Sequence, residues 1–305
     1  MNKLELHLHT NTSCNLSCIH CYNNSGETDS FPEIGQILDT IRLICTLYDT
    51  SIHLEGGEIF LRPALLSAMS GLPPEILRVI TVTTNGTIFL DDCEIIRVLR
   101  SLDVLRVSVE GHTAKLHEQI RGGSFCDVLN NAGKYRDLGV PLCLRITLNR
   151  LNYRNFISNT IESLAEQGFA RFQIYEFQSV GRGKNSASSL SLNFPLTDLL
   201  QEMCTVSIPG VSLDMMFPER RRRELFAAKS ALERNGYQLI ELPCEAGISI
   251  HANGDVYKCA WENDPKSRLC NWYLDKDALS TLQGSNLKHH CEHCSSFRVS
   301  LKPVS

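Results

Sequence analysis

The chain has 305 residues, a formal net charge of -4, 43% hydrophobic residues and 21% charged residues. These values are typical of a globular protein and exclude a largely disordered chain. The first residues are charged, and no apolar run reaches the ~20 residues of a membrane helix, so we expect a cytoplasmic protein that does not bind membranes. The mild negative charge gives no support for a nucleic-acid partner. Thirteen cysteines in a reducing compartment indicate metal binding or catalysis rather than disulfides.

Strands and helices alternate over the first two thirds of the chain. Leu4, Leu6 and Leu8 alternate with polar residues, which predicts a strand. Further strands are predicted at 51–54, 79–84, 104–109, 142–148 and 172–177, and helices at 31–48, 64–70, 92–101, 125–138 and 154–167. This order predicts an α/β fold with a parallel sheet, either curled as a barrel or doubly wound. In both arrangements ligands bind beyond the carboxyl ends of the strands.

The pattern changes after the sixth strand. Residues 179–195 are rich in Gly, Ser and Asn, which predicts a loop or linker. Asn253-Gly254 separates two short apolar runs and predicts a β-hairpin. We place a soft boundary near 205–240, which divides the chain into residues 1–205 and residues 206–305.

A long charged helix is predicted at 218–235. Within it, the run Arg220–Arg223 is flanked by Glu219 and Glu224. We expect a solvated helix face there, with a docking patch for an acidic partner as the second interpretation.

Three cysteines, Cys14, Cys18 and Cys21, directly follow the first predicted strand. A loop this tight can turn three thiolates toward one point, and thiolates select zinc, copper(I) or iron–sulfur clusters. A structural zinc site normally has four ligands, and His20 is the nearest candidate for the fourth. Three ligands on a four-iron cluster would leave one iron open, which is the usual mark of a catalytic metal.

The run from Cys14 to Tyr22 (CNLSCIHCY) resembles the cluster motif C-x3-C-x-φ-C of the radical S-adenosylmethionine (SAM) superfamily. His20 stands at φ, which is usually aromatic in that family. The resemblance covers roughly residues 4 to 183. It extends to Gly56-Gly57-Glu58 (family GGE), Thr84-Asn85-Gly86 (family TNG), Ser108-Val109-Glu110-Gly111 (family SLDG, with Glu for Asp), His117 and Arg121-Gly122.

This resemblance implies a partial (β/α)6 barrel and a 4Fe–4S cluster held by Cys14, Cys18 and Cys21. In the family, the open iron binds the amino and carboxylate groups of SAM. One electron from the reduced cluster, supplied by a flavodoxin- or ferredoxin-type donor, breaks the sulfur–C5′ bond homolytically. The 5′-deoxyadenosyl radical then abstracts hydrogen from the substrate.

Roles for individual residues follow from the same resemblance. The backbone of Gly56 and Gly57 would receive the SAM amino group, with Glu58 beside it and Asn85 on the next strand end. Ser108 and Glu110 would lie near the ribose and methionyl end. Arg121 or Arg145 would pair with the SAM carboxylate, because guanidinium groups suit carboxylates. His20, Tyr22 and Tyr175 are candidates to line the adenine, although Tyr175 also fits an ordinary core position.

Five further cysteines lie in the C-terminal part: Cys244, Cys259, Cys270, Cys291 and Cys294. Their spacing around the predicted hairpin resembles the twitch or SPASM modules that follow some radical SAM barrels. We favour the shorter twitch version, with one auxiliary iron–sulfur cluster, expected to be 4Fe–4S. Its ligands would be Cys244, Cys259, Cys291 and Cys294, with Cys270 as an alternative ligand. A zinc ribbon uses similar CxxC pairs and is the competing interpretation.

The remaining cysteines are assigned to packing, since a free cysteine behaves as a small buried hydrophobe. They are Cys45, Cys93, Cys126, Cys143 and Cys204.

The resemblance leaves the substrate open. Twitch and SPASM enzymes often mature ribosomally made peptides in natural-product biosynthesis, and this is the function we expect. Because the barrel begins at residue 4, a leader peptide would need a separate leader-binding protein or the barrel rim. The alternative is a small-molecule dehydrogenase that oxidises an aminocyclitol-like alcohol, and the remote alternative is a non-catalytic zinc-binding scaffold.

Overall fold

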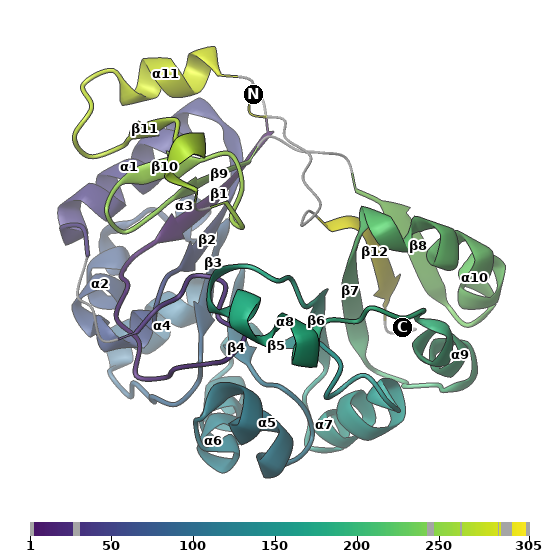
Figure 1. Ribbon diagram of the computed structural model, residues 1–305. Helices are drawn as coiled ribbons and strands as arrows, with labels where there is room; N and C mark the ends of the chain where they lie inside the picture. Colours follow the sequence, from purple (N-terminus) through teal and green to yellow (C-terminus); the bar gives the residue numbers. More distant parts are fainter. Residues whose placement is uncertain are drawn as a thin grey trace.

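A computed structural model describes residues 3–26, 31–242, 247–262, 264–285, 287 and 295–302 of the chain. One curled sheet forms its centre, and most helices lie on the outside of the curl (Figure 1). The first seven strands are β1 (Lys3–His9), β2 (Asp49–Glu55), β3 (Ile80–Thr84), β4 (Val104–Ser108), β5 (Leu142–Leu148), β6 (Arg171–Glu176) and β7 (Ser212–Pro218). Each pairs in parallel with the next.

Five more strands extend the sheet on both sides: β8 (Tyr237–Glu241), β9 (Gly247–Ile250), β10 (Asp255–Tyr257), β11 (Cys270–Asn271) and β12 (Ser295–Leu301). The order across the sheet is β11-β10-β9-β1-β2-β3-β4-β5-β6-β7-β12-β8. Within the described residues the sheet stays open between its two outer strands. The predicted α/β partial barrel is therefore confirmed.

The helices of the chain are α1 (Ile34–Leu47), α2 (Pro63–Ala68), α3 (Pro74–Leu77), α4 (Cys93–Ser101), α5 (Ala114–Arg121), α6 (Phe125–Asp137), α7 (Glu162–Glu166), α8 (Ala187–Leu190), α9 (Thr197–Thr205), α10 (Arg222–Arg234) and α11 (Ala278–Gly284). Their ends follow local chemistry. The Asp92 carboxylate accepts from the N–H groups of Glu94 and Ile95 and so caps the first turn of α4. The helix predicted at 154–167 is instead a π-helical turn at Phe156–Ile161 followed by α7.

The side chains of β1 alternate between the hydrophobic core and the inside of the barrel. Leu4, Leu6 and Leu8 are fully or almost fully buried in the hydrophobic core, whereas Glu5 and His7 on the opposite face are only partly covered. Because alternate residues of a strand face opposite sides, the polar set shares the concave face of the sheet. The interior of the barrel is therefore polar along β1.

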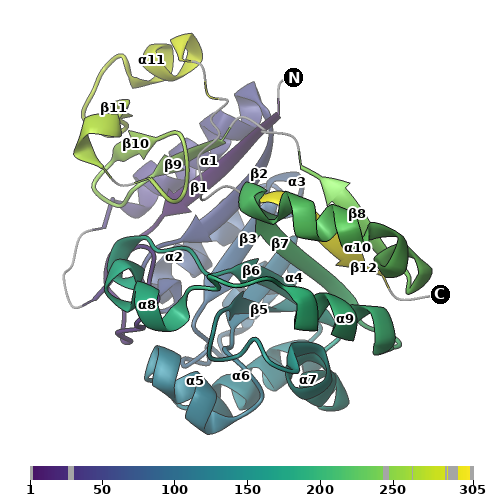
Figure 2. The same ribbon diagram turned by 45° about the vertical axis from the view of Figure 1, so that its right-hand side comes forward.

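The C-terminal part of the chain contributes to both edges of the sheet. The β9–β10 hairpin, predicted around Asn253-Gly254, lies beside β1, and β12 lies between β7 and β8 (Figure 2). The sheet runs on across the boundary predicted at residues 205/206, and the division into two domains stays a prediction. The sequence pattern gave no sign of β7, β8 or β12.

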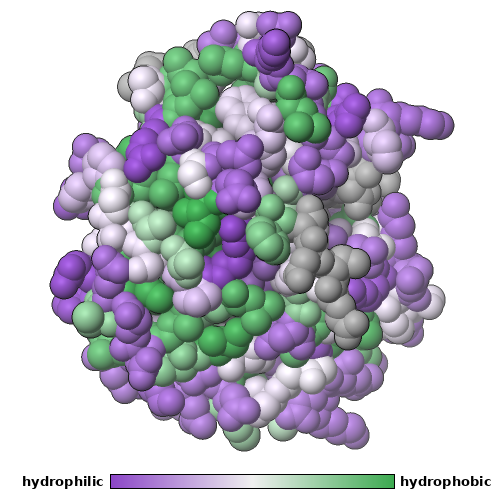
Figure 3. Space-filling view, turned by 90° about the vertical axis from the view of Figure 1, so that its left-hand side faces the viewer, coloured by the Kyte–Doolittle hydropathy of each residue, from purple (hydrophilic) through white to green (hydrophobic). Residues whose placement is uncertain are grey.

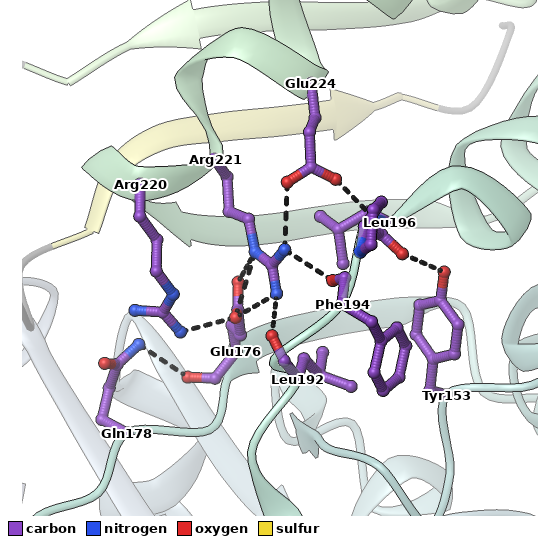
Figure 4. A network of polar contacts seen from close by, with 10 residues as sticks. Tyr153, Glu176, Gln178, Leu192, Phe194, Leu196, Arg220, Arg221 and Glu224 are labelled. Atoms are coloured by element: carbon purple, nitrogen blue, oxygen red, sulfur yellow. Dashed lines mark hydrogen bonds and ion pairs between the residues drawn. The ribbon is translucent and has the colours of Figure 1, made fainter.

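The end of β6 carries a buried polar network (Figure 4). Arg221 donates to both carboxylate oxygens of Glu176 and to one oxygen of Glu224. Its guanidinium also donates to the main-chain carbonyls of Leu192 and Phe194. Arg221 is 4% exposed, so the expected solvated face of Arg220–Arg223 is wrong at this position.

Two of the cysteines assigned to packing are also corrected. Cys93 and Cys126 are exposed, because they stand at the solvent side of the first turns of α4 and α6. Cys143 is buried, and Cys45 and Cys204 are partly buried.

The surface over α1, α2 and α4 intersperses hydrophilic and hydrophobic residues (Figure 3). Leu274 and Phe31 are exposed among the larger apolar side chains. In the parts of the chain that the structure describes, no helix is both long enough and apolar enough to span a bilayer.

Candidate active site

A pocket opens at the carboxyl ends of the parallel strands, where the fold class places ligands. Its walls come from the loop after β1, the ends of β2 to β6 and the segment after β10. The residues that line it are Cys14, Leu16, Cys18, His20, Cys21, Tyr22, Ser25, Glu55, Gly56, Gly57, Thr83, Thr84, Asn85, Ser108, Arg121, Arg145, Thr147, Tyr175, Glu176, Phe177, Gln178 and Trp261.

The three cysteines of the first cluster meet in this pocket as free thiols. Asn85 points its side-chain amide at the sulfur of Cys14 at 3.8 Å, and Arg121 Nη1 lies 3.9 Å from the sulfur of Cys18. Burial raises the pKa of the Cys18 thiol to about 11, and the neighbouring sulfurs of Cys21 and Cys14 add to the rise. Thiolates so placed need a positively charged centre, which is what an iron–sulfur cluster provides.

Two buried polar atoms in the pocket wall also fit a bound cofactor. His20 Nδ1 and the Thr83 hydroxyl have no hydrogen-bond partner within the described residues. Buried polar groups in proteins are nearly always paired, so a ligand that hydrogen-bonds here would complete the site.

Arg121 and Glu110 form the main ion pair beside the cysteines. Arg121 donates from Nε (3.0 Å) and Nη2 (2.8 Å) to Oε1 of Glu110, and His20 Nε2 lies 3.0 Å from the same oxygen. Burial would raise the pKa of Glu110, but its contacts with His20 and Arg121 lower it to about 2. Glu110 therefore lies behind the pocket wall as the carboxylate partner of Arg121.

Arg145, the other candidate for the SAM carboxylate, lies over the ring of Tyr175 at 5.0 Å. No carboxylate lies within ion-pair distance of its guanidinium among the residues that the structure describes. Because Arg121 is already paired, Arg145 is the better placed of the two to receive a carboxylate from a ligand.

Glu58 does not line the pocket. Its carboxylate accepts hydrogen bonds from the hydroxyl of Thr84 (2.6 Å) and from the N–H groups of Asn85 (2.6 Å) and Phe60 (3.0 Å). Glu58 therefore orders the turn at the end of β3, and that turn carries Asn85 toward Cys14. Its carboxylate is thus turned toward the β3 turn, and its predicted place beside the SAM amino group stays a prediction.

Gly56 and Gly57 bring the end of β2 against the loop after β1. A Cβ on Gly57 would lie 1.8 Å from the carbonyl oxygen of Ser13, and Gly56 has a φ of +140°. Only glycine permits this contact. The Gly pair is thus needed to place the loop after β1 at the pocket. This loop carries Cys14, Cys18 and Cys21 and is called the cysteine loop below.

Glu5, His7 and His53 form a second titratable cluster inside the barrel, with ligand atoms within 4.8 Å of one another. The two imidazoles are stacked with an interplanar angle of 21°, so their nitrogen lone pairs lie in nearly parallel planes, which is a poor arrangement for binding one ion. Arg106 also donates to His53 Nδ1 at 3.0 Å. We assign this trio to an ion-pair network, since a cation would have to break it.

That network reaches the pocket through Glu55. His7 Nδ1 donates to Glu55 at 3.0 Å, and the hydroxyl of Tyr22 donates to the other carboxylate oxygen. Burial would raise the pKa of Glu55, but the charge of His7 holds it well below its ordinary value. Tyr22 is thereby fixed beside Cys21.

The C-terminal hairpin contributes to the same wall. The ring centroids of Trp261 and Tyr22 lie 5.1 Å apart in an edge-to-face arrangement. The ring of His251 stacks on that of His9, with centroids 4.5 Å apart. Cys259 lies two residues before Trp261 and accepts a hydrogen bond from its N–H. Cys270 is buried in β11 among core residues. The other predicted auxiliary ligands, Cys244, Cys291 and Cys294, lie outside the described residues.

The sequence patterns therefore identify most of the pocket: the cysteines, His20, Tyr22, the Gly pair, Asn85, Ser108, Arg121 and Arg145 all line it. Several lining residues were missed, among them Glu55 and Trp261. Glu55 directly precedes the Gly pair, which could have indicated it. Trp261 carries no sequence signal, because it reaches the pocket from a segment far along the chain.

A family model described as the Radical SAM superfamily matches residues 9–157. Among curated proteins, the AdoMet-dependent heme synthase of Methanosarcina barkeri (strain Fusaro / DSM 804) is 30% identical over 181 residues, covering 57% of this chain and 50% of that protein. The sporulation killing factor maturation protein SkfB of Bacillus subtilis (strain 168) is 26% identical over 193 residues, covering 61% and 46%. The chain thus spans about half the length of the curated relatives it matches.

A solved structure has a similar fold over most of this chain. Streptococcus suis SuiB, bound to its precursor peptide SuiA, superposes with a TM-score of 0.68 at 18% identity, over 94% of this chain and 66% of that one. At this identity the likeness shows the fold alone. Residues 9–157, which match the Radical SAM superfamily model, thus carry the three cysteines that line the pocket, and this part of the chain is similar to that superfamily.

Proposed function

We propose that this chain uses SAM to modify a peptide, with Cys14, Cys18 and Cys21 holding a 4Fe–4S cluster in the pocket. The observation that carries the proposal is that three free thiols line one pocket at the strand ends with the guanidinium of Arg145, which has no carboxylate partner among the described residues. A cluster held by these cysteines would supply the electron for reductive cleavage of SAM, and so the radical chemistry that takes a hydrogen atom from the substrate.

The chain's own residues would hold and orient these groups. Arg145 would receive the SAM carboxylate, and the backbone at Gly56–Gly57 would receive the amino group. Ser108 would lie at the ribose. Arg121 would keep its place between Glu110 and Cys18, where its charge offsets that of the thiolates. Tyr22 and Trp261 would close the wall and exclude water from the reacting atoms.

We also propose the auxiliary cluster, with Cys259, Cys244, Cys291 and Cys294 as ligands. Leu242 and Ser296, the described residues two positions away from Cys244 and Cys294, are hydrogen-bonded at 2.9 Å. Cys259 follows β10, whose partner β9 begins three residues after Cys244. These contacts support a common site. Cys270 is buried in the core, which makes it a packing residue in this proposal.

The peptide substrate is supported by the relatives. SkfB is named as a maturation protein, and SuiB was solved with a precursor peptide. The heme synthase relative keeps a small-molecule substrate as the second candidate. A flavodoxin- or ferredoxin-type donor would supply the electron in either case, and a leader-binding protein would be a further partner for a peptide.

The substrate experiment combines the reconstituted protein with SAM, dithionite and synthetic peptides encoded beside its gene. A mass change in one peptide, absent when Cys14 is replaced by Ala, supports the proposal. Oxidation of an added aminocyclitol, with every peptide unchanged, would favour the second candidate. The iron content tests the auxiliary site: about eight iron atoms per chain are expected, and about four in Cys259→Ala.

A further inference from the structure

Arg182, in the segment that follows β6, hydrogen-bonds to the cysteine loop, although the two lie more than 150 residues apart in the sequence. The main-chain N–H of Arg182 donates to the carbonyl of Cys21 at 2.9 Å. Its guanidinium donates from Nη1 to the carbonyl of Cys18 at 3.0 Å and from Nη2 to the carbonyl of Ser25. One residue therefore binds three carbonyls of the loop that carries the pocket thiols.

Gly181 permits this approach. It has a φ of +54°, and a Cβ there would lie 2.1 Å from the carbonyl oxygen of Tyr22 and 2.7 Å from that of Cys21. Any other residue would push the two segments apart. The contact is thus set by the backbone as well as by the Arg182 side chain.

The loop itself has little regular structure to hold it. Between Asn15 and Ser25 it consists of turns and irregular backbone. Main-chain bonds join Cys14 to Gly26 at 2.8 Å and Ile19 to Ile120 at 3.0 Å. Cys18 and Cys21 lie between these attachments. The Cys21 N–H donates to the Cys18 carbonyl at 3.2 Å, and both carbonyls also accept a hydrogen bond from Arg182, which joins this turn to a distant segment.

We propose that Arg182 is a positioning residue for the iron–sulfur site, which holds the carbonyls of Cys18 and Cys21 so that their sulfurs face the pocket. The inference rests on the proposed function, because it takes these cysteines as the cluster ligands. It goes beyond that function by assigning a role to a segment that the sequence patterns describe only as a loop. Replacing a residue that hydrogen-bonds to a metal-ligating residue typically lowers the affinity for the metal roughly 10- to 100-fold.

The test compares Arg182→Gln and Arg182→Lys with the wild-type chain after anaerobic loading with iron and sulfide. Lys184→Gln is the matched control, since Lys184 is exposed and lies in the same 3-10 helix, Gly181–Ser186. Two quantities are measured: the half-life of iron loss to a chelator, and the electron paramagnetic resonance spectrum of the reduced cluster.

We expect Arg182→Gln to shorten the half-life roughly tenfold and to change the spectrum. Arg182→Lys, which keeps one charged donor, should recover part of both, and Lys184→Gln should match the wild type. If Arg182→Gln fails to fold, the Lys variant carries the same comparison. A wild-type half-life and spectrum in the Arg182 variants, even with a lower melting temperature, would overturn the inference alone. A wild-type chain that takes up no iron would instead overturn the proposed function.

Discussion

Glu176 and Arg221 form a buried, two-point ion pair: Arg221 Nη2 lies 2.8 Å from Oε1 of Glu176, and Nε lies 3.0 Å from Oε2. Both residues are less than 5% exposed. The pair joins the end of β6, at the rim of the pocket, to the start of α10. Removing Arg221 would leave the buried Glu176 carboxylate with Arg220 alone, whose Nη2 lies 2.6 Å from Oε1.

Replacing Arg221 by Ala should therefore lower the free energy of unfolding by about 3 kcal/mol, the lower end of the range for a broken buried ion pair, because Arg220 still pairs with Glu176. Arg222 is the matched control, because it also pairs with glutamates but its side chain is 50% exposed. Arg222→Ala should lower the free energy of unfolding much less, because water and salt screen an exposed ion pair. Urea titrations of the metal-free proteins give both values, and an equal loss in the two variants would contradict the assignment of a buried pair.

The ion pairs of His7 should make stability depend on pH. Burial would lower the pKa of His7, but the carboxylates of Glu55 and Glu5 raise it from its ordinary 6.5 to about 9. A group whose pKa is higher in the folded state stabilises the fold fully below the unfolded pKa. That stabilisation is lost as the pH rises through the folded pKa.

The difference in unfolding free energy between the wild type and His7→Gln should thus be greatest below pH 6.5 and should shrink up to pH 9. The pH-dependent part amounts to about 3 kcal/mol at most. Urea titrations at closely spaced pH values measure it. A difference that stays constant or grows with pH would show that His7 is neutral in the folded protein.

Gly57→Ala should disrupt the cysteine loop, because the new methyl group would overlap the carbonyl of Ser13. Gly35→Ala is the control: Gly35 lies in α1, and no atom lies within 4 Å of an added Cβ there. Gly35→Ala should leave iron uptake unchanged and should stabilise α1 by up to about 1 kcal/mol. Iron content after anaerobic loading separates the two. Full iron uptake by Gly57→Ala would contradict the close contact.

Arg145→Gln should weaken SAM binding, since it removes the only charged donor that we assign to the SAM carboxylate. Charge-assisted hydrogen bonds contribute about 1.5–3 kcal/mol, so the dissociation constant should rise roughly 10- to 150-fold. Arg171→Gln, at the exposed start of β6, should have no effect. Anaerobic calorimetric titration of the iron-loaded, unreduced protein measures both constants. Unchanged SAM binding in Arg145→Gln would show that another residue binds the SAM carboxylate.

The sequence predicted the parallel barrel and most of the pocket because both depend on local patterns. Buried strands between helices show as apolar runs, and Cys14, Cys18 and Cys21 lie within eight residues of each other. The family resemblance then placed Gly56, Asn85 and Ser108 at the ends of the right strands. These features can be predicted without knowing which distant segments of the chain come into contact.

Long-range contacts escaped prediction for the same reason. Arg182, Trp261 and Glu55 act through partners that are far away in the sequence, so their environment appears only in the folded chain. Arg221 lies in a charged run that looks solvated until the end of β6 is placed against it. Glu58 has the right position in its motif, but its carboxylate is turned to Thr84 and Asn85.

The central claim is that the three thiols in the pocket hold the cluster that cleaves SAM. The most direct measurement is the amount of 5′-deoxyadenosine formed from SAM by the anaerobically loaded protein under dithionite. The wild type should form it, and Cys14→Ala, Cys18→Ala and Cys21→Ala should each form none, whereas Cys143→Ala, outside the pocket, should match the wild type. A wild-type protein that binds one zinc ion and leaves SAM intact would contradict the claim.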